Sequence, residues 1–132
     1  MPATVLDHIG IAVSDLESAL ALYRALGLEP SGTEEIPHEG VRVAMLPFPG
    51  GRVELLEALT PESPVGRFLA RRGPGLHHLA LQVADLEAAA VQARAAGARL
   101  VNDTIQRGAG GHRYVFLHPT STGGVLLELV EA

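Results

Sequence analysis

The sequence predicts an α+β fold of two tandem strand–helix–three-strand units. Residues 76–83 repeat residues 6–13 at an offset of 70 (78 − 8), and the triplet 15–17, Asp-Leu-Glu, recurs at 85–87. A spacing that persists over two dozen positions indicates an internal duplication. Each copy opens on an apolar, strand-like run that carries one histidine and closes on an apolar run that carries one glutamate. A four-stranded sheet buries too little alone, so we expect the copies to form one curved mixed sheet around a cleft, with the helices outside.

The composition suits one globular domain. The chain has 132 residues, 47% of them hydrophobic, and a net charge of −5. The charge argues against a nucleic-acid-binding surface. No apolar run has the length of a membrane span, and no signal peptide is visible, so a cytoplasmic location is expected. The absence of cysteine excludes disulfides, thiolate ligands and a cysteine nucleophile.

The first copy occupies about residues 4–59. Its opening run has strand character and carries His8, and small residues share the histidine's face by period two. Asp15 can cap a helix that Gly27 ends. The Pro49-Gly50-Gly51 turn is predicted to be longer than the two-residue kind. The predicted strands are 5–13, 28–35, 41–48 and 52–59, the last of which carries Glu54, and the helix is 16–26.

A proline- and glycine-containing linker at about 60–74, with a short helix near 65–71, leads to the second copy at about 75–132. Its first strand carries His78 and its last strand carries Glu128. The predicted strands are 76–83, 99–102, 113–117 and 125–130, the helix is 86–96, and 106–112 is a glycine-rich loop.

Two histidines and two glutamates, one of each per copy, are the candidate site: His8, Glu54, His78 and Glu128. Taken singly, each histidine would be expected to be a hydrogen-bonded core residue, and each glutamate would be expected to face the solvent. Their fourfold coincidence with the duplication favours one shared site. Two imidazoles and two carboxylates suit divalent Co, Ni, Mn, Fe or Zn, with positions left for water or substrate.

The other polar residues carry weaker signals. His77 points away from His78 by strand alternation, so we expect it to be structural or to support a ligand. His38, His112 and His118 lie in predicted loops at the surface. The glycine-rich loop with Arg107 and Arg113 is a weak candidate for phosphate, and a plain hairpin is the simpler reading. Solvated residues are expected at Glu57, Glu62, Arg71 and Arg72.

The duplicated unit resembles the vicinal oxygen chelate superfamily, which includes glyoxalase I and the extradiol dioxygenases. Within it, the chain is most similar to the methylmalonyl-CoA epimerases. The resemblance covers essentially the whole chain, and its specific pieces are residues 7–13, 62–65, 68–69, 75–78, 116–119 and 123–129.

The resemblance implies an isomerase that binds one divalent metal, with cobalt the first choice and Ni, Mn or Zn as alternatives. It implies His8, His78 and Glu128 as metal ligands, with Glu54 at a fourth ligand position that is glutamine in some members. Val43 stands where some members carry a glutamate proposed as a base. A homodimer and a CoA thioester substrate, with no nucleic acid or membrane, are also implied.

The implied reaction is epimerisation of (2R)- and (2S)-methylmalonyl-CoA. The C2 proton, between a thioester carbonyl and a carboxylate, would be removed and returned through an enolate that the metal stabilises. Glu128 is the expected ligand and base, and Glu54 is either the opposing catalytic group or a fourth ligand.

Other functions use similar residues. A glyoxalase I-like lactoylglutathione lyase differs in substrate only. An extradiol dioxygenase would leave an open 2-His-1-carboxylate iron site. A non-catalytic small-molecule-binding protein of the same fold, and a purely structural dimer module, complete the alternatives.

Overall fold

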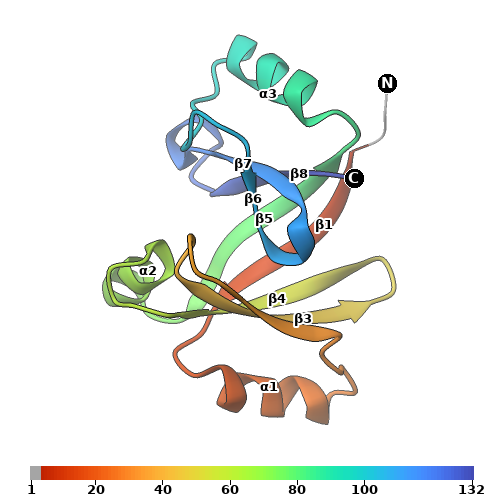
Figure 1. Ribbon diagram of the computed structural model, residues 1–132, viewed down its shortest axis with the longest axis vertical. Coiled ribbons are helices and arrows are strands. Elements are labelled where there is room, and N and C mark those ends of the chain that lie inside the picture. Colours follow the sequence, from red (N-terminus) through yellow and green to blue (C-terminus); the bar gives the residue numbers. More distant parts are fainter. Residues whose placement is uncertain (1–3) are drawn as a thin grey trace. The chain divides into compact units, whose positions relative to one another are not determined.

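The computed structural model describes residues 4–132, which form eight strands and three α-helices (Figure 1). Two compact units share the chain. One comprises His8–His77, and the other combines residues 4–7 with His78–Ala132. Each half of the sequence runs strand, helix, three strands, as predicted. The elements are β1 (Val5–Ala12), α1 (Leu16–Ala25), β2 (Gly32–Ile36), β3 (Val41–Phe48), β4 (Gly51–Ala58), α2 (Pro64–Arg72), β5 (Gly75–Val83), α3 (Leu86–Ala95), β6 (Gln106–Arg107), β7 (Arg113–Leu117) and β8 (Leu127–Glu131).

In the first half, the strands follow the order β2-β3-β4-β1. β1 is parallel to β4, whereas β3 is antiparallel to both of its neighbours. Alternation sends one set of side chains to α1, which Figure 1 shows alongside β3 and β4. That set builds a core around Leu16, Leu20, Leu46 and Leu55, all at most 2% exposed. The opposite face of these strands points away from α1.

The second half repeats this arrangement in the order β5-β8-β7-β6. β5 is parallel to β8, and β7 is antiparallel to both β8 and β6. The core between these strands and α3 is built from Leu86, Val115, Leu117 and Leu129. The sequence repeat is therefore a repeat of structure, in which a parallel strand pair and a helix on one face recur together.

An arginine clamp ties the helix to the strands in each half. In the first, Arg42 of β3 lies 4.0 Å from Glu17 of α1 and 3.7 Å from Glu57 of β4. Glu57 also accepts a 2.7 Å hydrogen bond from the Leu16 amide at the start of α1. Glu57 was expected to be solvated, and this is wrong. The Leu16 amide lies in the first helical turn, where it has no acceptor within the helix, and it donates to the Glu57 carboxylate instead.

The second clamp uses the corresponding residues. Arg113 of β7 pairs with Glu87 of α3 and, at 2.7 Å, with Glu131 of β8. Glu131 accepts a 3.3 Å hydrogen bond from the Leu86 amide. The Arg113 side chain holds the pKa of Glu87 below its ordinary value, chiefly through their hydrogen bond.

Helix α2 begins at a cap provided by Ser63, whose hydroxyl accepts a hydrogen bond from the Gly66 amide. Gly66 packs tightly, since a Cβ there would lie 2.4 Å from the Thr60 carbonyl oxygen. Gly40 has a φ of +67°, and a Cβ there would lie 2.5 Å from that of Ser63. These contacts fix the loop after β4 and hence the path of the chain into α2.

Several predicted boundaries differ from the structure. The strand expected at 28–35 begins only at Gly32, because the Leu28 amide donates to the Tyr23 carbonyl at the helix end and Pro30 has no amide hydrogen. The turn after β3 is the two-residue kind, since Phe48 pairs directly with Gly51. The last strand begins at Leu127 instead of Val125.

The strand expected at 99–102 is also absent. The chain there makes one isolated bridge, between Leu100 and Leu117. A two-residue strand, β6, forms later, inside the segment predicted as a loop. The bend over residues 101–104 interrupts the ladder with β7 and divides the expected strand.

No helix among the described residues is long and apolar enough to cross a membrane.

Candidate metal and acid–base site

The first half brings His8 and Glu54 together. Gly10 of β1 is in register with Glu54 of β4, and two-residue alternation puts His8 on the same face. His8 is 3% exposed and Glu54 is 4% exposed. The His8 Nε2 atom lies 3.5 Å from Glu54 Oε1. Arg52, two residues before Glu54 on the same face, donates from Nε to Glu54 Oε2 at 2.8 Å.

The second half brings together His78 and Glu128. Ala80 of β5 is in register with Glu128 of β8, which puts both side chains on one face. The His78 Nε2 atom lies 3.0 Å from Glu128 Oε1, and each residue is 8% exposed. The Phe116 ring, opposite Glu128 on β7, meets the His78 imidazole edge-on at 5.4 Å and orients it.

Both pairs lie on the face of their strands that points away from the helix of their own half. The α1 core uses Ile11, Val53 and Leu55, the alternate residues of β1 and β4, and the α3 core uses Leu81 and Leu129 in the same way. Small residues accompany the histidines on the opposite face, with Gly10 after His8 and Ala80 after His78. The repeat thus produces the same buried imidazole–carboxylate pair twice.

Each pair offers one imidazole nitrogen and one carboxylate oxygen. All four residues are buried, and His8, His78 and Glu128 each present a ligand atom suited to a metal ion. Buried carboxylates require a cation or hydrogen-bond donors around them. Nitrogen and oxygen donors of this kind fit borderline and hard divalent ions.

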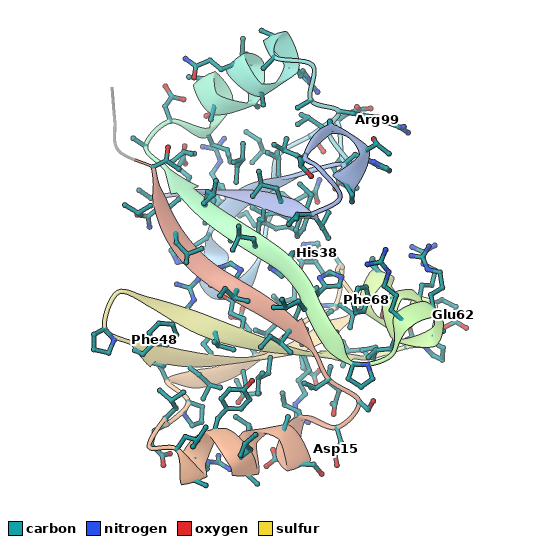
Figure 2. The ribbon with its side chains drawn as sticks, turned by 180° about the vertical axis from the view of Figure 1, so that it is seen from behind. Asp15, His38, Phe48, Glu62, Phe68 and Arg99 are labelled. Atoms are coloured by element: carbon teal, nitrogen blue, oxygen red, sulfur yellow. The ribbon has the colours of Figure 1, made fainter. Side chains whose placement is uncertain are left out.

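His77 has a structural role. Its ring meets the Phe68 ring of α2 edge-on, with the centroids 5.0 Å apart, and the Arg72 guanidinium lies 5.9 Å from the centre of that ring. Figure 2 shows Phe68 and His38 toward the α2 side of the first half and Phe48 at its other end. The packing of His77 on α2 fits its expected orientation away from His78.

The remaining candidates stand apart from the two pairs. His38 is exposed next to Glu39, and His112 is also exposed. His118 caps a short 3-10 turn by accepting the Thr120 amide at 3.2 Å. Arg113 is engaged in its clamp and Arg107 donates to the Gly111 carbonyl at 3.0 Å, so both cations of the glycine-rich loop, a weak candidate for phosphate, make contacts within the protein.

One contact of the site, that of Arg52 with Glu54, was not found in the sequence. Arg52 was noted only as the start of a strand, although its position two residues before Glu54 was the available signal. Val43, expected at a position that is glutamate in some similar proteins, is 2% exposed and lies opposite Glu34 of β2.

A family profile for the Glyoxalase/Bleomycin resistance protein/Dioxygenase superfamily matches residues 7–116. Among characterised relatives, the human mitochondrial methylmalonyl-CoA epimerase is 36% identical over 96% of this chain and 73% of its own length. The ethylmalonyl-CoA/methylmalonyl-CoA epimerase of Cereibacter sphaeroides is 39% identical over 94% of this chain and 95% of its own length.

Solved structures agree. The methylmalonyl-CoA epimerase of Mycobacterium tuberculosis superposes with a TM-score of 0.92 at 42% identity, covering 99% of this chain and 92% of its own. A methylmalonyl-CoA epimerase in complex with methylmalonyl-CoA and ammonium gives a TM-score of 0.94 at 42% identity, covering 98% of this chain and 94% of its own. Similarity of this extent confirms the predicted α+β fold with tandem βαβββ units.

Proposed function

We propose that this chain, which belongs to the Glyoxalase/Bleomycin resistance protein/Dioxygenase superfamily and, within it, to the methylmalonyl-CoA epimerases, interconverts (2R)- and (2S)-methylmalonyl-CoA. The observation that carries the proposal is the similarity to an epimerase solved with methylmalonyl-CoA, at 42% identity over 98% of this chain. The two buried imidazole–carboxylate pairs supply groups suited to the chemistry. The protein is accordingly proposed to act as an isomerase on a CoA thioester.

The proposed metal ligands are His8, His78, Glu128 and Glu54. The support is their burial and their nitrogen and oxygen donors, which fit a divalent ion. A bound divalent ion would act as a Lewis acid toward the charge that develops on the substrate's oxygens. The Phe116 ring against His78 and the Arg52 guanidinium against Glu54 would keep a ligand from each half in a fixed orientation.

Proton transfer at C2 is the role proposed for the carboxylates. The thioester carbonyl and the free carboxylate of the substrate both withdraw charge from C2, which makes its proton removable. One carboxylate takes this proton, and the C–H electron pair passes into the enolate. An acid on the opposite face then returns a proton to C2. Glu128 is proposed as ligand and base, and Glu54 as the opposing group or the fourth ligand.

The test is proton NMR of the metal-reconstituted protein with a single epimer of methylmalonyl-CoA in deuterated water. We expect deuterium at C2 and loss of optical purity. Absence of exchange with Co, Ni, Mn and Zn would refute the activity. Turnover of methylglyoxal with glutathione in that case would establish the lactoylglutathione lyase reading instead.

Matched variants test the residues. Glu128→Gln should lower the exchange rate at least 100-fold, the range that a positioned acid–base group contributes. His78→Gln should lower the exchange rate through loss of a metal ligand. His112→Gln, in an exposed histidine outside both pairs, should leave the rate unchanged. Equal rates in all three variants would contradict the assignment. Isothermal titration with the metal alone separates loss of ion binding from loss of proton transfer.

Three finer points complete the proposal. Cobalt is the proposed ion, the protein is proposed to form a homodimer, and its location is proposed to be cytoplasmic. The ion and the dimer rest on the family resemblance, and the location rests on the absence of any apolar run in this sequence long enough to span a membrane. Light scattering in solution tests the dimer, and a particle of one chain, 13.8 kDa, would refute it.

A further inference from the structure

The face of the first half that points away from α1 carries a second carboxylate besides Glu54. We propose that Glu34 of β2 is the proton-transfer group of this half, with Glu54 kept as a metal ligand. The inference rests on the proposed epimerase function and deepens it, because it assigns the opposing acid–base group.

Strand register puts Glu34 on this face. Glu34 is directly opposite Val43, and Val43 is directly opposite Leu56, which shares its face of β4 with Glu54. Glu35, the next residue, points the other way. Among the described residues of β1 to β4, the carboxylates on this face are Glu34 and Glu54 alone. The neighbouring positions of β3 are Val43 and Met45, which cannot transfer a proton.

Glu54 is poorly placed to move a proton. Its side chain is 6% exposed, Oε2 accepts from Arg52 at 2.8 Å, and Oε1 lies 3.5 Å from His8 Nε2. Both oxygens are therefore engaged, one by the Arg52 guanidinium and the other by the His8 imidazole. Glu34 is half-buried and lies on β2, the outer strand of this half, so its carboxyl can exchange protons with water.

Glu34 and Glu54 stand on the same face of the sheet at some distance along it. Glu34 is two strands and two residues away from Glu54, which corresponds to about 12 Å between their Cα atoms at ordinary strand spacing. Strand side chains stand roughly perpendicular to the sheet, so both carboxyl groups rise from this face. Glu54 contacts His8 of β1, on the side away from β2, and the positions between the two glutamates are Val43 and Met45. A substrate carbon would therefore have to approach Glu34 from the side of Val43 and Met45.

The step balances with the groups named. The ionised Glu34 carboxylate takes the C2 proton of one epimer, so that the C–H bond breaks, an O–H bond forms and the electron pair enters the enolate. Glu128, protonated, then gives its proton to the opposite face of C2. Exchange of both carboxyls with water resets the enzyme, and the other epimer runs the same sequence in reverse.

The experiment compares Glu34→Gln with Glu35→Gln, its neighbour on the opposite face, and with Glu34→Asp. C2 hydrogen exchange into deuterated water is measured separately from each epimer, with the titrated metal affinity and the melting temperature alongside. We expect Glu34→Gln to lose at least 100-fold in exchange from one epimer while the other still exchanges without inversion. The metal affinity of Glu34→Gln should equal that of Glu35→Gln. The exchange rate of Glu34→Asp should lie between those of Glu34→Gln and Glu35→Gln.

Two other outcomes have distinct meanings. If the wild-type protein exchanges but Glu34→Gln stays within about threefold of Glu35→Gln for both epimers, the inference is overturned and the epimerase function stands. A large loss of metal affinity in Glu34→Gln would also overturn it, since Glu34 would then act through the ion. If the wild-type protein shows no exchange, the proposed function itself fails.

Discussion

Replacing Glu57 by alanine should destabilise the protein by about 2–3 kcal/mol. The carboxylate accepts the Leu16 amide at 2.7 Å, and a hydrogen bond to a charged group is worth about 1.5–3 kcal/mol. Its negative charge at the start of α1 adds about 0.5 kcal/mol. The Arg42 contact, at 3.7 Å between partly exposed side chains, adds little after solvent screening. Leu16 is fully buried, so the freed amide has little access to water.

Urea denaturation of Glu57→Ala, Glu57→Gln and Glu62→Ala measures this effect. Glutamine keeps an acceptor oxygen for the Leu16 amide, so Glu57→Gln should lose only about 1 kcal/mol. Glu62 is exposed near α2, and its removal should change the free energy of unfolding by less than about 0.5 kcal/mol. A stability of Glu57→Ala equal to that of Glu62→Ala would refute the capping role. Equal losses in the alanine and glutamine variants would assign the effect to charge instead of the hydrogen bond.

Three further predictions concern stability and titration. Gly66→Ala should cost about 2 kcal/mol in chemical denaturation because its Cβ meets a carbonyl oxygen at 2.4 Å, whereas Gly32→Ala, with only an ordinary contact at 3.7 Å, should be nearly neutral. Leu55→Ala should cost about 3 kcal/mol or more by the same measurement, since it leaves a cavity in a fully buried site. Glu87 has a folded pKa below its ordinary 4.5, chiefly because of its hydrogen bond with Arg113. Its contribution to stability is therefore present above the ordinary value and is lost as the pH falls through the folded pKa. An NMR titration of Arg113→Met should show this pKa raised toward the ordinary value, with the Glu87 backbone hydrogen bond still lowering it.

The sequence was most informative where a residue pattern repeats. The offset of 70 located His8 and His78, and the closing apolar runs located Glu54 and Glu128, so the four residues of both pairs were predicted. Period-two alternation was enough to assign the site faces, because each strand packs its other face on a helix. The metal and the catalytic roles remain predictions.

What the sequence could not supply depends on contacts between strands. Arg52 and Glu34 gain meaning only from register, since a one-residue slip would turn Glu34 to the opposite face. Glu57 was misassigned because nothing local shows that a helix amide 41 residues earlier comes within 2.7 Å. The short β6 was missed because a two-residue strand has no periodicity to detect.

The two arginine clamps allow one ion-pair arrangement to be compared with a second copy of it inside the same protein. Arg42 and Arg113 perform the same task with side chains that are 36% and 29% exposed, in one solution at one salt concentration and temperature. Hydrogen exchange at the Leu16 and Leu86 amides would report each clamp separately within a single sample. Adding salt would weaken both ion-pair networks, and the difference between the two protection factors would measure how their surroundings change that weakening. Both values come from one sample, so the errors of comparing separate proteins do not arise.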